Sequence, residues 1–277
     1  MVWARLYKNP FAVLGLVILL ITILAAIFAP LIAVESPIKM NIREAMLPTG
    51  SPNHPLGTDD LGRDVLSRLI YGSRVSLQVG LIVVGISATV GVTLGAISGY
   101  YGGVIDNIIM RFSDIMQAFP FLVLALAVVS IVGASLTNMM IVLGAVSWVD
   151  YARLMRGMVL VEREKEYIQS AQAIGARDSR IIFHHILPNC LSTILVQATF
   201  GVANAILAAS SLSFLGMGAQ PPTPEWGAML NAARPFLRDN PMLSVVPGVA
   251  IMLTVLSINF IGDALRDALD PRLVQRS

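Results

Sequence analysis

Charged residues are scarce in this sequence. They make up 13% of its 277 residues, whereas a soluble domain carries about 25%. Hydrophobic residues make up 56%, so water cannot be the solvent for most of the surface of such a chain. Several uncharged stretches are long enough to cross a bilayer. The composition therefore argues against a soluble protein and predicts an all-α polytopic membrane protein.

Residues that commonly bind metals or phosphates are also few. The single cysteine, Cys190, cannot form an internal disulfide and says nothing about the compartment. His54 is remote in sequence from His184 and His185, and adjacent helical side chains point about 100° apart, so no metal site is expected. No lysine follows a glycine, as the lysine of a phosphate-binding loop would. Any ATPase that drives this chain must be another protein, and no cofactor is expected here.

The chain also lacks a large net charge of either sign. The formal net charge is +2, and no block of lysine or arginine forms a stripe that could bind a polyanion. Nucleic acid is therefore not an expected partner. Membrane lipid and other proteins are the partners that such an apolar chain predicts.

Six membrane spans are predicted from the uncharged runs and their breaks. About 20 apolar residues suffice to cross a hydrocarbon core of roughly 30 Å. The first run is too long for the apolar part of a cleaved signal peptide. The run 115–149 is too long for one untilted helix and is broken at Gly133, so it predicts two spans that extend into the charged flanks. The spans are expected at 11–33, about 75–99, two around 115–149, about 191–214 and about 242–262.

The second span carries a stripe of small residues. Gly91, Gly95 and Gly99 recur at every fourth position, which places them on one helix face and allows a neighbouring backbone to approach closely. The stripe predicts helix packing rather than chemistry.

The central parts of the predicted spans contain no ionisable residue, which argues against coupling to a proton or ion gradient. They contain neutral amides and hydroxyls, and a neutral polar lining suits a conduit for varied solutes. Each of these side chains could instead bond a neighbouring helix. The candidates for a translocation path are Asn138, Gln197, Asn204, Ser210 and Asn259.

Lysine and arginine predict the orientation, because they accumulate in cytoplasmic loops. If both termini are cytoplasmic, most of the 19 basic residues lie on the cytoplasmic side, and the segment from Arg153 to Arg180 decides the balance. The stretch from Val34 to Arg74 then lies outside, where acidic residues accompany its basic ones.

Part of this outer stretch, residues 58–74 (TDDLGRDVLSRLIYGSR), predicts an amphipathic helix that opens within residues 58–60. Asp64 and Arg68 are four positions apart and are expected to pair at its surface. Such a helix would lie on the outer membrane surface or against the pore mouth. It would serve either as a structural collar or as a contact for a delivery protein.

The cytoplasmic loop between the fourth and fifth spans, residues 157–188, predicts a helix–turn–helix. Ile168, Ala171 and Ile174 follow one another at helical spacing, and Gly175 suits a left-handed C-terminal cap. A unit of this size has too little area for its own core, so its apolar face is expected to seat in a groove on another subunit. A plain connecting loop is the alternative.

The second helix of this unit is expected to run from Asp178 to Leu187. Asp178 falls in its first turn, where a negative charge complements the helix dipole. Pro188 is expected to end it, because proline cannot continue the hydrogen-bonded ladder without a break.

The same loop resembles the cytoplasmic signature of permease subunits of ATP-binding-cassette importers, of the dipeptide, oligopeptide and nickel group. That signature is Glu-Ala-Ala, three residues, Gly, nine residues and Ile-x-Leu-Pro. Here Gln169, Ser170 and Ala171 precede Gly175, and the segment ends in His-Ile-Leu-Pro at residues 185–188. The acidic residue is missing and His185 replaces isoleucine, as is known in the peptide branch.

Two further stretches carry the resemblance, HPLGTDDLGRDVLSRLIYGSRVSL at 54–77 and PPTPEWGAML at 221–230, followed by GDALRDALDPRL at 262–273. With the span count they cover nearly the whole chain, which is similar to the second, C-type permease subunit of peptide importers. The resemblance implies a type I importer permease fold, with a first part (1–73) containing the peripheral first span and a core permease domain (74–277).

The resemblance also implies partners. These are a sister permease that completes a heterodimeric pore, two cytoplasmic ATPases that bind ATP and magnesium, and an extracytoplasmic solute-binding protein, all at a bacterial inner membrane. The segment implied to couple ATPase closure to pore opening contains Glu166, Tyr167, Ser170, Ala171, Ile174, Gly175, Ala176, Arg177 and Asp178. The expected solutes are di- and oligopeptides. Nickel, glutathione or another small solute is an alternative, and a self-sufficient channel or ion-coupled transporter is an alternative of another class.

Overall fold

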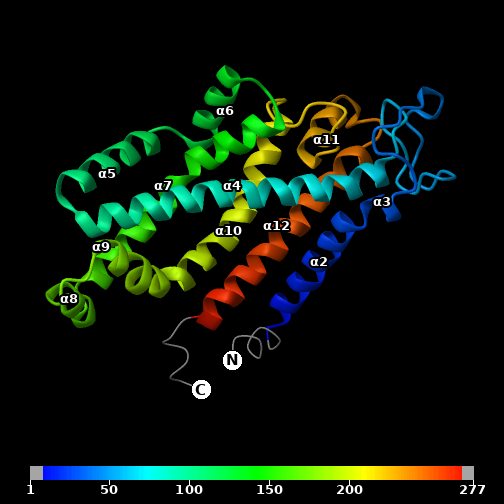
Figure 1. Ribbon diagram of the computed structural model, residues 1–277. Helices are drawn as coiled ribbons and strands as arrows, with labels where there is room; N and C mark the ends of the chain where they lie inside the picture. Colours follow the sequence, from blue (N-terminus) through cyan, green and yellow to red (C-terminus); the bar gives the residue numbers. More distant parts are fainter. Residues whose placement is uncertain (1–8, 270–277) are drawn as a thin grey trace.

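The computed structural model describes residues 9–269 and confirms the all-α class, since the described part contains no strand. The long helices lie side by side (Figure 1). The helices are α2 (Pro10–Ile27), α3 (Ala29–Ile32), α4 (Val65–Tyr101), α5 (Gly103–Gln117), α6 (Phe121–Val132), α7 (Leu136–Arg163), α8 (Glu166–Ala173), α9 (Asp178–Arg180), α10 (Leu187–Phe214), α11 (Trp226–Ala233) and α12 (Met242–Leu269). The N-terminal end (residues 1–8) and the basic residues beyond Leu269, whose cytoplasmic location is predicted, lie outside the described residues.

Each of the six predicted spans falls on a helix or on a bent pair of helices. α2, α4, α12 and the continuous helix 178–214 are each long and apolar enough to cross a bilayer. α5 and α6 meet this test only together, and they are bent by 90° at the break between them. α7 is 28 residues long, but charged side chains in its second half make it less apolar.

The third predicted span differs from expectation, because α5 is amphipathic and is not a straight continuation into α6. Its polar side faces α7, where Arg153 donates to Asp114 at 2.6 Å and Arg156 donates to Asp106 at 2.6 Å. Its other side exposes apolar residues such as Ile108. Charge pairing therefore holds α5 against α7 and leaves α6 as the apolar part of this pair.

The glycine stripe on α4 packs against α7, as the spacing predicted. A Cβ atom at Gly91 would lie 2.3 Å from the backbone oxygen of Trp148, and one at Gly95 would lie 2.3 Å from that of Ala152. At Gly99 it would lie 2.8 Å from the Cβ of Val159. Only residues without a side chain allow the two helix backbones to approach so closely.

The predicted separate amphipathic helix at 58–74 is wrong. Residues 58–63 form a turn, because the Asp59 carboxylate accepts from the backbone N–H groups of Leu61 and Arg63, at 3.0 and 2.9 Å. The helix begins only at Val65 and continues without a break to the end of α4. At 37 residues, α4 is about 55 Å long, so its first turns extend the second span beyond the length that a bilayer requires.

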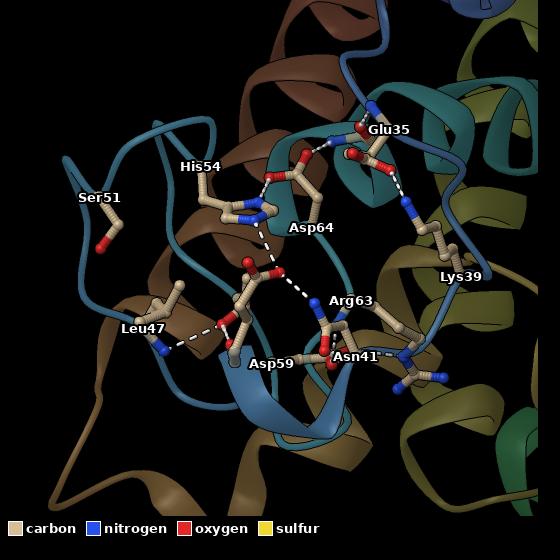
Figure 2. Close-up of polar contacts among 12 residues, drawn as sticks. Glu35, Lys39, Asn41, Leu47, Ser51, His54, Asp59, Arg63 and Asp64 are labelled. Atoms are coloured by element: carbon tan, nitrogen blue, oxygen red, sulfur yellow. Dashed lines mark hydrogen bonds and ion pairs between the residues drawn. The ribbon is translucent and has the colours of Figure 1, made fainter.

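Asp64 does not pair with Arg68, contrary to expectation, because it is the N-cap of α4. One carboxylate oxygen accepts from Ser67 N at 2.7 Å, and the other lies 2.9 Å from His54 Nδ1, both side chains being buried (Figure 2). Arg68 instead lies 3.5 Å from Asp59 and donates to the carbonyl of Pro37 at 3.0 Å. This network ties the loop 33–64 to the start of α4.

α2 lies at the edge of the bundle, packed against α12 and α4. A Cβ at Gly15 would lie 2.7 Å from the backbone oxygen of Ser257, which shows how closely α2 and α12 run. The start of α2, the end of α12 and α8 gather towards one end of the molecule, and the loop 33–64 and α11 lie at the other (Figure 1). The division of the chain after residue 73 stays a prediction, since that residue lies within α4.

We expect Gly95→Ala to destabilise the protein, because the added methyl group would meet the backbone of α7 and force the helices apart. The loss in the free energy of unfolding should be about 1–3 kcal/mol, measured by thermal unfolding in detergent. Gly85→Ala is the matched control on the same helix, since no atom lies within 4 Å of a Cβ there. Equal melting temperatures for the two variants would contradict the packing role.

Candidate functional site

One end of the molecule carries a small folded unit, residues 164–186, which we name the helical tip. α8 forms its first part and ends at Gly175, which has a φ of +79°. The N–H of Gly175 donates to Gln172 O at 2.9 Å and that of Ala176 to Ala171 O at 3.0 Å. These are the bonds of a left-handed C-terminal cap, so the predicted end of this helix is confirmed.

The apolar face of α8 is divided between the interior and the surface. Ile168 and Ala171 are buried in the core of this chain, together with Ile181 and Ile186 from the next helical segment. The expectation that this face is free to enter another subunit is therefore wrong for Ile168 and Ala171, because they hold α8 in place. Ile174 is 85% exposed and is the residue of the predicted face that remains free.

The second helix of the tip does not end at Pro188, which corrects a prediction. A π-helical stretch, Ile181–Ile186, leads into α10 with Pro188 in its first turn. In this wider winding the N–H of Leu187 donates to Ile182 O. The proline ring is accommodated there, and Asn189 Nδ2 donates to the His185 carbonyl at 2.7 Å. The tip is consequently continuous with α10 as well as joined to α7.

Hydrogen bonds fix the base of the tip to both helices. Tyr167 on α8 donates to Glu162 of α7 and accepts from Asn189 Nδ2 of α10 at 2.8 Å. Partial burial raises the pKa of Tyr167 to about 12, and the hydrogen bond to Glu162 adds to this shift. The phenol thus stays protonated and keeps donating at neutral pH. Tyr100 at the end of α4 donates to Asp178 at 2.9 Å.

The structure brings the predicted coupling residues together on the helical tip, but not all at its surface. Phe183, which the sequence did not single out, is 62% exposed beside them. Glu166, Tyr167, Ser170, Ile174, Gly175, Arg177 and Asp178 are exposed, Ala176 is half-buried and Ala171 is buried. Their part in coupling to an ATPase stays a prediction.

A second candidate region is a cavity of about 350 Å³ between four helices. The wall is formed by α4, α6, α7 and α10, and both apolar and polar side chains line it. The polar lining residues are Ser87, Ser147, Asp150, Tyr151, Gln197, Asn204 and Ser211. A cavity of this size and mixed lining is typical of a small-molecule site.

The residues predicted to line a translocation path divide into two groups. Gln197 and Asn204 line the cavity. Asn138 instead donates to the Gly133 carbonyl at 3.0 Å and closes the turn before α7. Ser210 is buried where α10 meets α11, and Asn259 is half-buried on α12, which contributes nothing to this cavity.

The sequence analysis missed Asp150. It lies midway along α7, which runs from Leu136 to Arg163, and it lines the cavity, although the depth of Asp150 in the bilayer, and with it the expectation of uncharged span centres, stays a prediction. The uncharged run 115–149 ends just before it, which placed Asp150 at the edge of the expected span. In the structure the helix begins late, after the break at Gly133, and therefore has Asp150 near its middle.

Family comparisons agree with this geometry. Residues 91–275 match the model of the binding-protein-dependent transport system inner membrane component family. The chain belongs to this family. Residues 1–52 also match the N-terminal transmembrane domain of oligopeptide transport permease C. The chain is thus a membrane permease component and not itself a catalytic enzyme.

Among curated relatives of this permease component, a dipeptide transport system permease protein DppC from Alkalihalophilus pseudofirmus is 50% identical, over 97% of this chain and 88% of the relative. A glutathione transport system permease protein GsiD from Pectobacterium atrosepticum is 48% identical, over 80% of this chain and 74% of the relative.

A solved structure of the MetNI methionine ABC transporter, in an inward-facing conformation, matches the permease component in fold. The TM-score is 0.57 at 19% identity, with 73% of this chain and 97% of that chain covered. The likeness supports the importer permease fold and, at this identity, nothing finer.

Ile168→Asp should unseat α8, because it buries a charge without a partner where the native side chain is fully enclosed. We expect trypsin to cleave after Arg177 at least about tenfold faster than in the unchanged protein. This factor corresponds to a decrease of about 1.4 kcal/mol in the free energy needed to open the tip. Ile174→Asp, on an exposed position of the same unit, is the control and should leave the rate unchanged. A protected tip in Ile168→Asp would show that α8 is held by other contacts.

Proposed function

We propose that this chain forms half of the translocation pore of an ATP-driven, binding-protein-dependent importer for di- and oligopeptides. The observation that carries the proposal is the connection of the helical tip to the cavity. α7 and α10 both line the cavity. α10 is continuous with the tip, and α7 is joined to it by a two-residue turn and by the hydrogen bond from Tyr167 to Glu162. A force applied to the tip therefore reaches two walls of the cavity through rigid helices.

The exposed end of the tip suits a groove on a cytoplasmic ATPase. Ile174 and Phe183 present apolar surface there, and Arg177 and Arg180 lie beside Phe183. An apolar anchor with charged neighbours is a common way for a small helix to dock in a groove. Closure of two such ATPases around ATP and magnesium would move the tip, and α7 and α10 with it.

The remaining partners follow from the same proposal. A sister permease completes the pore, and an extracytoplasmic solute-binding protein delivers the solute to the end formed by α11 and the loop 33–64. The importer lies in a bacterial inner membrane with both termini of this chain in the cytoplasm. Relatives named as dipeptide permeases support peptides as the solute. Glutathione is the second candidate, because a relative named for glutathione transport is nearly as similar.

The proposal is tested by reconstituting the chain with its sister permease, two ATPases and the solute-binding protein in liposomes. We expect ATP-dependent uptake of labelled dipeptides, and no solute flux when this chain is reconstituted alone. Ile174→Asp should reduce both uptake and ATPase co-purification at least about tenfold, since it places a charge in an apolar contact.

Ile174→Asp is interpretable because the exposed position leaves the fold intact, which trypsin resistance of the tip verifies. Uptake of glutathione in preference to dipeptides would favour the second candidate solute. Conduction by the chain alone would contradict the permease proposal and favour a self-sufficient channel.

Orientation is tested with one reporter cysteine. Ser179 is exposed on the tip, and the native thiol of Cys190 is buried and can be replaced by alanine. Ser179→Cys should resist a membrane-impermeant maleimide in intact cells and react after permeabilisation. A cysteine at Ser51, in the outer loop, is the matched control and should react in intact cells. Reversal of this pattern would overturn the orientation and the docking of ATPases at the tip.

A further inference from the structure

The cavity wall contains one formal charge, the carboxylate of Asp150. Every other polar group that lines the cavity is a neutral hydroxyl or amide. Asp150 lies midway along α7, and ionisable residues that face a cavity between membrane helices are typically functional. The side chain is exposed to the cavity, so it is available to a solute.

The charge of Asp150 is not balanced within residues 9–269. Its one polar side-chain contact in this part of the chain is Gln117 Nε2, at 3.4 Å, and no ion pair includes it. The basic residues one and two turns further along α7 are already used, since Arg153 pairs with Asp114 and Arg156 pairs with Asp106 on α5. The two arginines of α7 are therefore paired with carboxylates of α5, whereas the carboxylate of Asp150 faces the cavity without an ion-pair partner among the described residues.

A second group beside Asp150 is also without a partner. The hydroxyl of Tyr151 is buried and makes no hydrogen bond within the described residues, and the residue as a whole is 4% exposed. Tyr151 lines the cavity. A Cβ atom at position 201 would lie only 2.2 Å from the hydroxyl oxygen of Tyr151. Gly201 thus makes room for the Tyr151 hydroxyl inside the cavity wall, next to the Ser87 hydroxyl.

We propose that Asp150 forms a solute subsite that binds an ammonium group. The carboxylate would accept a hydrogen bond from the ammonium of a peptide in transit. Gln197 and Asn204, on the facing wall formed by α10, offer amides to the rest of the peptide. This inference rests on the proposed function, which makes the cavity part of the peptide path.

A carboxylate at this position suits a solute that passes through the cavity rather than one that is bound tightly. An ion pair open to water is worth about 0–1 kcal/mol, so a solvated carboxylate orients the amino end of a peptide without retaining it. The ammonium group is common to peptides of every sequence, whereas the side chains differ. One negative charge in an otherwise neutral wall would thus select for a free amino group and tolerate variety elsewhere.

The experiment uses the complete reconstituted importer and measures dipeptide uptake per ATP hydrolysed. Asp150→Glu should stay close to the unchanged protein, Asp150→Asn should fall by up to about fivefold, and Asp150→Lys should fall further, because it repels the ammonium group. ATP hydrolysis stimulated by the loaded binding protein should be unchanged in all three. Asp263→Asn, which removes an exposed carboxylate of α12 outside the cavity, is the control and should have no effect.

Equal uptake by Asp150→Asn and the unchanged protein would overturn the subsite. Parallel loss of complex assembly or ATP hydrolysis in Asp150→Asn would also overturn it, since the carboxylate would then pair with a basic residue of the sister permease. Failure of the unchanged importer to take up dipeptides, while it still hydrolyses ATP in response to its binding protein, would refute the peptide function itself. The last result is distinct from the first two because it does not depend on Asp150.

Discussion

The close contact between α4 and α7 is the constraint on which the rest of the structure depends. Three glycines on α4 let the two backbones touch, with Gly91 and Gly95 against the carbonyl groups of Trp148 and Ala152. Tyr151 lies between these two residues in sequence, so the contact sets the rotation of α7 about its axis. That rotation turns Asp150 and Tyr151 to the cavity and directs Arg153 and Arg156 to α5.

The same rotation relates the two candidate regions. α7 forms part of the cavity wall at Asp150, and Glu162 in its last turn accepts a hydrogen bond from Tyr167 at the base of the helical tip. α10 forms the opposite wall of the cavity and also reaches the tip, because the π-helical stretch before Pro188 keeps α10 continuous with the tip. Two helices therefore connect a surface suited to a motor protein with a cavity suited to a solute, α10 without a break and α7 through the two-residue turn at 164–165.

The local features that were predicted correctly depend on near neighbours in sequence. The end of α8 at Gly175 follows from glycine's freedom to adopt a positive φ, and the glycine stripe follows from a four-residue repeat. The failures occurred where the chain adopted a turn or made a contact that helical spacing does not encode. Residues 58–63 form a turn around Asp59 instead of a helix, Asp64 binds His54 instead of Arg68, and a wide helical turn accommodates Pro188.

The sequence by itself determined the all-α membrane class, the positions of the long apolar helices and the place of the helical tip, because hydrophobic length and glycine and proline positions act along a single segment. Only the tertiary structure decided which side chains meet. In the tertiary structure Ala171 is buried, whereas Ile174, at the end of the same short helix, is exposed. Asp150 lies across a cavity from Gln197 and Asn204. These relations depend on how helices distant in sequence are rotated against one another, and spacing within one helix carries no information about that rotation.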